Sequence, residues 1–249
     1  MQPEILGISG SPIKNSNTDR AVKAILAASG LQSEFVKLSD LQIGPCRACR
    51  GCVNDNVCKT KDDFPALAEK VKQAKSLVIG SYTPYSMVDG FSKAFFERLW
   101  SMRHVHALNQ GKLVVTVVTG VAWHAVNQAT DMITQEMAME RMEVVGNIKI
   151  NGNVPCLTCG HGHECKMSGV PSLHGKGATA SAEMCVAVEE QAEVWDEAQR
   201  LGQVLGERVR NGELGTKKSM RANIRPWRIP HMISLMIRTR RWNKSARRK

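Results

Sequence analysis

The sequence predicts an α/β protein with a doubly wound, five-stranded parallel sheet in the strand order 2-1-3-4-5. Strand and helix patterns alternate along the first 212 residues, as expected for a parallel sheet covered on both faces. The predicted strands are short, apolar and rich in β-branched residues, and each predicted helix has one apolar face. Right-handed crossover connections then leave 2-1-3-4-5 as the natural topology.

The first half of the chain carries three of these strands. Strands are expected at 4–8, 34–38 and 76–81, with helices over 19–29 and from Asp62 onward. Gly30 ends the first helix, because glycine is preferred just after a helix C-terminus. Asp63 and Pro65 mark the start of the second helix, since proline is favoured in the first turn.

The second half supplies the remaining two strands. Strands are expected at 113–119 and 144–150, with helices from about residue 90, over 125–142 and over 186–211. The first of these strands is a β-branched run, which suits a buried position in a sheet. In the helix that follows it, Val126, Ala129, Ile133 and Met137 recur at helical spacing and predict one buried face.

Composition divides the 249 residues into a main domain, 1–212, and a basic amphipathic C-terminal extension, 213–249. The net charge is +11, and twelve Lys and Arg residues with no acidic residue lie between Lys217 and Lys249. This extension could pack on a neighbouring subunit, dock an acidic protein such as a ferredoxin, or lie on a membrane surface. Nothing else resembles a nucleic-acid recognition module, which argues against a nucleic-acid partner.

Four cysteines, Cys46, Cys49, Cys52 and Cys58, form the motif C-x2-C-x2-C-x5-C inside a loop over 44–60. Such spacing lets three sulfurs point inward from one tight loop while a longer arm returns the fourth, which suits a [4Fe–4S] cluster. Zinc is the alternative, although zinc modules more often use two separated pairs of ligands. The chain starts without a signal-peptide pattern, so we expect metal-binding thiols in a reducing, cytoplasmic compartment.

A second cysteine group lies in a Cys-, His- and Gly-rich insertion over 151–182 and just beyond it. Its members are Cys156, Cys159, Cys165 and Cys185. These four thiolates could hold a second iron–sulfur cluster, or His161 or His163 could supply a ligand and favour zinc. A glycine-rich lid with incidental thiols is the remaining interpretation.

Three loops follow the first, third and fourth predicted strands and should meet at one edge of the sheet. The first carries Ser11, Ser16, Asn17 and Thr18 at a helix start, which suits a single terminal phosphate such as that of FMN. It lacks the Gly-Lys-Ser/Thr of a Walker A loop, so nucleotide hydrolysis is not expected. The second loop, 82–90, is stiffened by proline and could lie along a flavin ring.

These loops carry a family resemblance. Gly7 to Pro12, Ser16 to Thr18, Pro84 to Met87, Lys93 and Phe95 to Arg98 resemble the flavodoxin-like NADPH-dependent FMN reductase superfamily. With the first cysteine motif, residues 4–150 are most similar to the iron–sulfur flavoproteins of anaerobic archaea and bacteria. The resemblance implies an FMN-binding main domain and homo-oligomers, dimers or tetramers, in which a cluster approaches a neighbour's flavin. The residues expected to hold FMN are Ser9, Ser11, Pro12, Ser16, Asn17, Thr18, Pro84, Tyr85, Ser86, Met87, Thr119 and Gly120.

The expected function is an iron–sulfur flavoprotein oxidoreductase. It would pass electrons from a one-electron donor such as ferredoxin through a [4Fe–4S] cluster and FMN to a small-molecule acceptor. The first alternative is an NAD(P)H-dependent FMN or quinone reductase whose cysteines hold structural zinc, and the second is a redox or metal sensor. No side chain demands a catalytic role. Tyr85 and His124 are candidates, with His124 expected to be structural or exposed.

Overall fold

A computed structural model describes residues 3–216 and 218–219 of the chain. Its centre is a parallel sheet in the order β2-β1-β3-β4-β5, which confirms the predicted topology. The strands are β1 (Ile5–Ser9), β2 (Ser33–Lys37), β3 (Ser76–Tyr82), β4 (Leu113–Gly120) and β5 (Glu143–Asn151). β1, β3 and β4 are buried along almost their whole length, as expected for central strands with helices on both faces.

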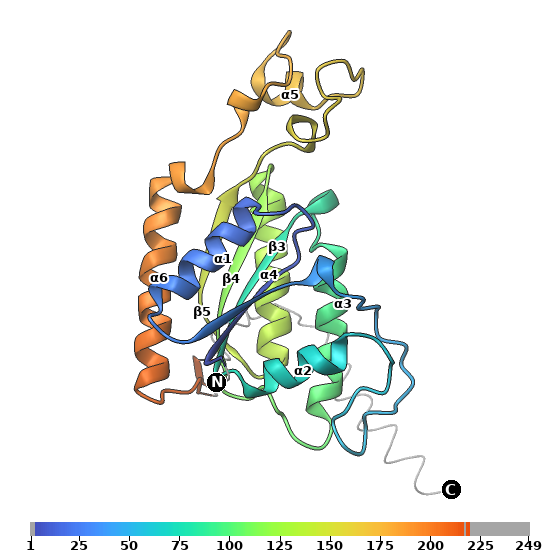
Figure 1. The fold of residues 1–249 in the computed structure, drawn as a ribbon, viewed down its shortest axis with the longest axis vertical. Coiled ribbons are helices and arrows are strands. Elements are labelled where there is room, and N and C mark those ends of the chain that lie inside the picture. The colour runs from blue at the N-terminus through green and yellow to red at the C-terminus, as the bar shows by residue number, and fades with distance from the viewer. Residues whose placement is uncertain (1–2, 217, 220–249) are drawn as a thin grey trace, which may run out of the picture.

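Helices cover both faces of the sheet (Figure 1). They are α1 (Asn17–Ala28), α2 (Phe64–Gln73), α3 (Gly90–Leu99), α4 (Trp123–Met139), α5 (Val170–His174) and α6 (Ala192–Arg210). α1 and α6 pack together on one face, while α2, α3 and α4 lie on the other. None of the helices in the described ranges combines the length and apolar character that a bilayer crossing requires.

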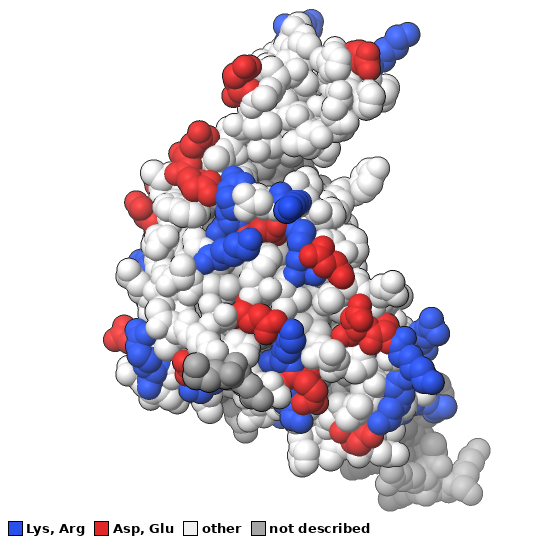
Figure 2. Space-filling model, in the orientation of Figure 1, with Lys and Arg blue, Asp and Glu red and all other residues white. Residues whose placement is uncertain are grey.

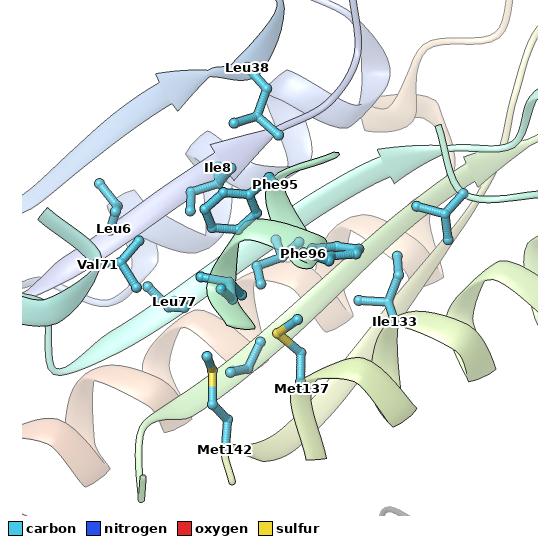
Figure 3. Close-up of a cluster of buried hydrophobic side chains, with 14 of the residues drawn as sticks. Leu6, Ile8, Leu38, Val71, Leu77, Phe95, Phe96, Ile133, Met137 and Met142 are labelled. Atoms are coloured by element: carbon cyan, nitrogen blue, oxygen red, sulfur yellow. The ribbon is translucent and has the colours of Figure 1, made fainter. Parts of the chain in front are cut away.

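The larger apolar core lies between the sheet and the α2–α3–α4 layer. Figure 3 shows Leu6, Ile8 and Leu77 of the sheet facing Phe95, Phe96 and Met137 of the helices. Each of these side chains is at most 4 % exposed. Burial of this kind stabilises the fold by about 1.5–3 kcal/mol per large side chain. The core therefore fixes the strand ends on which the three predicted cofactor loops sit.

Two predicted helix boundaries differ from the structure by three residues or more. The helix expected over 125–142 ends at Met139, because Arg141 adopts a left-handed conformation (φ 62°) and Met142 N–H donates to the carbonyl of Met137. These are the features of a Schellman C-cap. Met142 is still buried, but it follows the helix rather than belonging to it.

The helix expected over 186–211 begins only at Ala192. The reason is that the side chains of Asn17 and Asn153 form hydrogen bonds with the backbone of residues 186–188. Val186 N–H donates to Asn153 Oδ1 at 2.8 Å, and Val188 N–H donates to Asn17 Oδ1 at 3.2 Å. The Val186 carbonyl also accepts from the side-chain amides of Asn17 and Asn153, so it cannot accept an intrahelical bond. Ala187 (ψ 150°) and Gln191 (ψ 77°) have non-helical backbone, and the segment forms only a short 3-10 turn at 188–190.

The predicted insertion leaves the carboxyl end of β5 and extends from the body at the top of Figure 1. It is mostly irregular, with α5 and short 3-10 turns, and Val186 N–H donates to Asn153 at its base. The predicted C-terminal extension lies almost wholly outside the described residues, which end at 219.

Candidate cofactor and metal sites

The first loop follows β1 and leads into α1. Ser16 is the N-cap of α1, and its hydroxyl accepts from Asp19 N–H at 3.1 Å while the Asp19 carboxylate accepts from Ser16 N–H. This capping box begins the helix at Asn17, so the first N–H groups of α1 face the loop. A helix start of this kind attracts a phosphate group.

A buried ion pair supports the first loop from below. Asp19 is 1 % exposed, accepts a hydrogen bond from Ser9 Oγ at 2.6 Å and pairs with Lys37 Nζ at 2.6 Å. Ser11 is 3 % exposed, and its N–H donates to Ser9 Oγ at 3.3 Å. The Ser9 hydroxyl is therefore already hydrogen-bonded within the protein, and it stabilises the conformation of the loop.

The second loop carries two consecutive left-handed residues. Tyr85 has φ 49° and Ser86 has φ 64°, although neither is glycine. Such backbone costs about 1–3 kcal/mol per residue and clusters at functional sites. Tyr85 is fully exposed and Met87 is 45 % exposed. The Tyr85 ring therefore lies outside the core, exposed on the second loop.

Asp89 ties the second loop to the first. Its carboxylate is fully buried, accepts from Ser81 Oγ at 2.6 Å and caps α3 by accepting from Ser92 N–H at 2.8 Å. Burial raises the pKa of Asp89 despite these bonds. A Cβ added at Gly10 would lie 2.4–2.5 Å from the Asp89 oxygens, so glycine lets the two loops touch.

The third loop joins the same edge through a threonine pair. Thr18 Oγ1 donates to Thr119 Oγ1 at 2.8 Å, which connects the start of α1 to the end of β4. Trp123 and His124 follow and are both exposed, and His124 Nε2 lies 3.4 Å from Ser86 Oγ. The three predicted loops therefore do meet at the carboxyl edge of the sheet.

These residues fit FMN in their chemistry. The first loop offers a helix start and small hydroxyl side chains for a phosphate, and the second and third loops offer exposed apolar surface for a flavin ring. We call the opening between the three loops the mouth of the site. The exposed apolar side chains on and beside these loops are Ile13, Tyr85, Met87, Phe91 and Trp123. The side-chain amide of Asn17 also donates to the Val186 carbonyl at the base of the insertion.

The cysteine loop forms a hollow of about 580 Å³ with α3 and the end of α4. All four cysteines of the first motif line it, together with Phe96, Trp100 and Met139. Ala48 (φ 51°) and Arg50 (φ 60°) are left-handed and alternate with the cysteines. Backbone of this kind turns N–H groups inward and forms concavities that bind anions, including iron–sulfur clusters.

Arg98 of α3 holds this loop from the core. It is 1 % exposed and donates to both carboxylate oxygens of Asp62 (2.6 and 2.9 Å), to the Gly44 carbonyl (3.0 Å) and to Cys58 Sγ (3.2 Å). This bonding holds the pKa of Asp62 below its usual value. Asn56 fixes the other arm, because its side chain bonds the backbone of Ser101, Val105 and His106.

The four thiols of the first motif lie close enough to influence one another. Burial raises the pKa of Cys52, and the neighbouring Cys58, Cys46 and Cys49 raise it further. Four thiolates could share this loop only with a positive centre to neutralise them. All eight cysteines are free thiols, and within the described residues no three His, Cys, Asp or Glu side chains converge into a metal-binding group.

The second cysteine group is spread through the insertion. Cys156 and Cys159 occupy one turn, Cys165 lies exposed after the next turn, and Cys185 is half-buried near the base. His161 Nδ1 pairs with Glu164 at 3.1 Å, and both side chains are exposed. The structure therefore leaves these thiols separate as well.

Sequence reasoning missed three supporting residues. Arg98 belongs to a segment that carries the family resemblance, but the sequence assigned it no role. No sequence pattern pointed to Asp89 or Asn56. Each acts through burial and through bonds to residues at least eight positions away, except for the helix cap made by Asp89. A lone arginine on an otherwise apolar helix face was the one sign that could have been followed.

Comparison with known proteins agrees with this geometry. Residues 3–153 match the family of NADPH-dependent FMN reductases. An iron–sulfur flavoprotein of Methanocaldococcus jannaschii is 31% identical over 103 residues, which cover 40% of this chain and 53% of that protein. One from Methanosarcina thermophila is 26% identical over 148 residues, covering 58% of this chain and 78% of the relative. The chain thus spans about half the length of the first relative.

Solved structures agree on the fold. A flavone reductase superposes with a TM-score of 0.54 at 14% identity, covering 83% of this chain and 63% of its own. An oxidoreductase of Corynebacterium diphtheriae gives 0.51 at 14% identity, covering 84% and 98%.

The strand order β2-β1-β3-β4-β5 and the three loops at the carboxyl edge of the sheet define a flavodoxin-like α/β protein. Since the family match extends over more than half of the residues, the chain belongs to the NADPH-dependent FMN reductase family. This confirms the predicted family and the predicted fold class.

Proposed function

We propose that the protein is an iron–sulfur flavoprotein oxidoreductase with FMN on the three loops and a [4Fe–4S] cluster on Cys46, Cys49, Cys52 and Cys58. The main supporting observation is that all four cysteines line one hollow, where the buried Arg98 donates a hydrogen bond to Cys58 Sγ. A cluster transfers single electrons and FMN accepts one or two, so together they would connect a one-electron carrier to two-electron chemistry. A small oxidised molecule at the flavin face would be the acceptor.

The placement of the two sites supports a homo-oligomer. The cofactor loops lie where α3 and α4 begin, whereas the cysteine hollow lies along α3 and the end of α4. α4 has 17 residues and is therefore about 25 Å long. Exposed apolar side chains gather at both places, at the mouth and at Trp100 and Met139 in the hollow. Patches of this kind mark interaction surfaces, so a second copy would bring its hollow to this flavin.

The rim of the hollow suits an acidic one-electron donor such as a ferredoxin. Arg47, Arg50, Lys59, Lys93 and Arg103 line it. Glu97, Glu136 and Glu140 also line it and pair with Lys93 and Arg103, so the excess positive charge among these rim residues comes from Arg47, Arg50 and Lys59. Figure 2 shows Lys and Arg side chains gathered at the lower right, where Figure 1 places the cysteine loop. Positive charge at such a rim would steer an acidic carrier toward the cysteines.

A rapid-mixing experiment tests this function. We expect reduced ferredoxin to bleach the flavin of the wild-type protein. Bleaching of the flavin in the Cys46→Ser/Cys49→Ser variant should be at least about a hundredfold slower. The variant should bind FMN normally, because these cysteines lie away from the cofactor loops. Equal rates in both proteins would refute the proposed electron path.

The family match favours one alternative, an NAD(P)H-dependent FMN or quinone reductase with structural zinc on the first motif. Hydride transfer would require a nicotinamide to reach the flavin between the exposed Tyr85 and Trp123. This alternative predicts rapid bleaching by NADPH in the wild type and in the cysteine variant alike. It also predicts zinc, without iron, in the purified protein.

A further inference from the structure

The insertion is folded without an apolar core. Between Gly152 and Ala187 only Gly162 and Val170 are buried, and Met167 and Leu173 are exposed. A segment of this size cannot offset its loss of conformational entropy by burial alone. Small modules without a core are held by disulfides or by a metal. The cysteines here are all free thiols, which leaves the metal.

The backbone around these thiols is arranged to stabilise negatively charged sulfur. Gly169 N–H donates to Cys156 Sγ at 3.2 Å, and His161 N–H donates to Cys159 Sγ at 3.4 Å. Gly160, between the latter two residues, has φ 81° and makes the turn that directs this second N–H at the sulfur. N–H donors to sulfur are the outer-shell contacts typical of thiolate metal sites.

The return arm of the insertion runs back beside this turn. A Cβ at Gly162 would lie 2.0 Å from the Cys156 carbonyl oxygen and 3.0 Å from Ala180 Cβ, so both segments pack at this point. Further along, Val186 N–H donates to Asn153, two residues before Pro155. Cys185 is thereby held on the arm that borders the turn with Cys156.

We propose that the insertion is a metal-stapled module in which the thiolates of Cys156, Cys159, Cys165 and Cys185 hold a soft metal centre. Zinc and a second iron–sulfur cluster share this ligand chemistry, and the sulfide content distinguishes them. Binding would draw the separate thiols together and release their protons. The site uses none of the cysteines of the first motif, so it can be tested separately from the proposed function.

The module would be attached next to the cofactor loops. Asn17 of the first loop donates to the Val186 carbonyl at 3.0 Å, and Gly152 N–H donates to the Gly120 carbonyl at 2.9 Å. Asn151 and Gln191 close the same neck through a pair of hydrogen bonds. A rigid insertion would therefore constrain one side of the flavin site.

The test is a metal and sulfide count on full-length protein purified without oxygen. In a variant with Cys46, Cys49, Cys52 and Cys58 all changed to serine, we expect metal to remain. It should be about one zinc without sulfide, or about four iron with four sulfide. Adding Cys156→Ser and Cys159→Ser should remove that metal, whereas Met167→Ser, which deletes an exposed sulfur elsewhere in the insertion, should not. Metal-free protein before this addition, or metal unchanged after it, would overturn the proposal.

Trypsin provides a second readout that needs no metal count. Lys166 and Lys176 are the only trypsin sites between Gly152 and Gln191, and both are exposed. Loss of the metal should speed cleavage at these residues by at least about tenfold, because the loop would open far more often. The Met167→Ser protein should be cut at the wild-type rate. Equal cleavage of the Cys156→Ser/Cys159→Ser protein would contradict a stapling role.

Discussion

Arg98 Nη2 lies 3.2 Å from Cys58 Sγ, so a buried guanidinium donates directly to a sulfur of the first cysteine motif. The same group binds Asp62 and the Gly44 carbonyl, and its Cζ lies 4.6 Å from the centroid of the Phe64 ring. The loop is thus anchored to the core at both sides of the motif. A fixed positive charge at this sulfur would stabilise the more negative, reduced form of a bound cluster.

Replacing Arg98 should therefore lower the reduction potential of the cluster. For Arg98→Gln we expect a shift on the order of 60 mV, which is a tenfold change in a one-electron equilibrium. Arg98→Lys should shift it less, because the charge remains. The midpoint is measured by an EPR-monitored redox titration.

Two further variants make the Arg98 test decisive. Arg208→Gln removes an arginine that pairs with Glu143 and Glu213, away from the cysteines, and should leave the potential unchanged. Asp62→Asn keeps the donor to Cys58 and should retain iron, with a potential at or above that of the wild type. A potential in Arg98→Gln equal to the wild-type value, with full iron, would show that Arg98 only holds the loop.

Gly10 should be essential for assembling the flavin site. A Cβ there would lie 2.1 Å from Ser92 Oγ and within 2.5 Å of both Asp89 oxygens. Gly10→Ala should therefore displace the start of α3, weaken FMN binding at least about tenfold and destabilise the fold by about 1–3 kcal/mol. Gly90→Ala is the control, since nothing lies within 4 Å of a Cβ at that position. FMN fluorescence quenching measures the affinities, and equal affinities would mean that the two loops need not touch.

The fold was predictable because it depends on periodicity, whereas the contacts between loops were not. Alternating apolar runs define the five strands, and Gly30 and Pro65 mark helix ends locally. The start of α6 is set instead by Asn17 and Asn153, which lie 169 and 33 residues before Val186. No local pattern reveals such partners. The first cysteine motif was visible in the spacing, but the burial of Arg98 beside it depends on how α3 packs.

The Asn17 amide should matter more to the insertion than to FMN. It is already bonded to Val186 and Val188, so its contribution to a phosphate would come from the N–H groups at the start of α1. Asn17→Ala should speed tryptic cleavage at Lys166 but change the FMN dissociation constant by less than about threefold. Asn153→Ala, which loosens the same neck without touching the first loop, is the matched control. Weak FMN binding in Asn17→Ala alone would show that the amide holds the phosphate.

Glu140 should make the stability depend on pH. It is 7 % exposed beside the hollow, and burial raises its pKa from 4.5 to about 7 despite Arg103. The folded pKa is higher than the unfolded one, so the stabilisation is complete below pH 4.5 and is lost as the pH rises through about 7. The loss amounts to at most about 3 kcal/mol.

Glu140→Gln should remove most of this dependence, because glutamine does not ionise. Urea unfolding at pH 5 and pH 8 would then give more similar free energies for the variant than for the wild type. Glu193→Gln, at the exposed start of α6, should behave like the wild type. A pH dependence that survives in Glu140→Gln would place the responsible group elsewhere.

The most direct measurement is the iron, acid-labile sulfide and FMN content per chain of protein purified without oxygen, for the wild type and Cys46→Ser/Cys49→Ser. The wild type should contain FMN, iron and sulfide, and the variant should lose about four iron and four sulfide per chain while keeping its flavin. Zinc in place of iron in the wild type, or protein without flavin, would contradict an electron path between these cysteines and FMN.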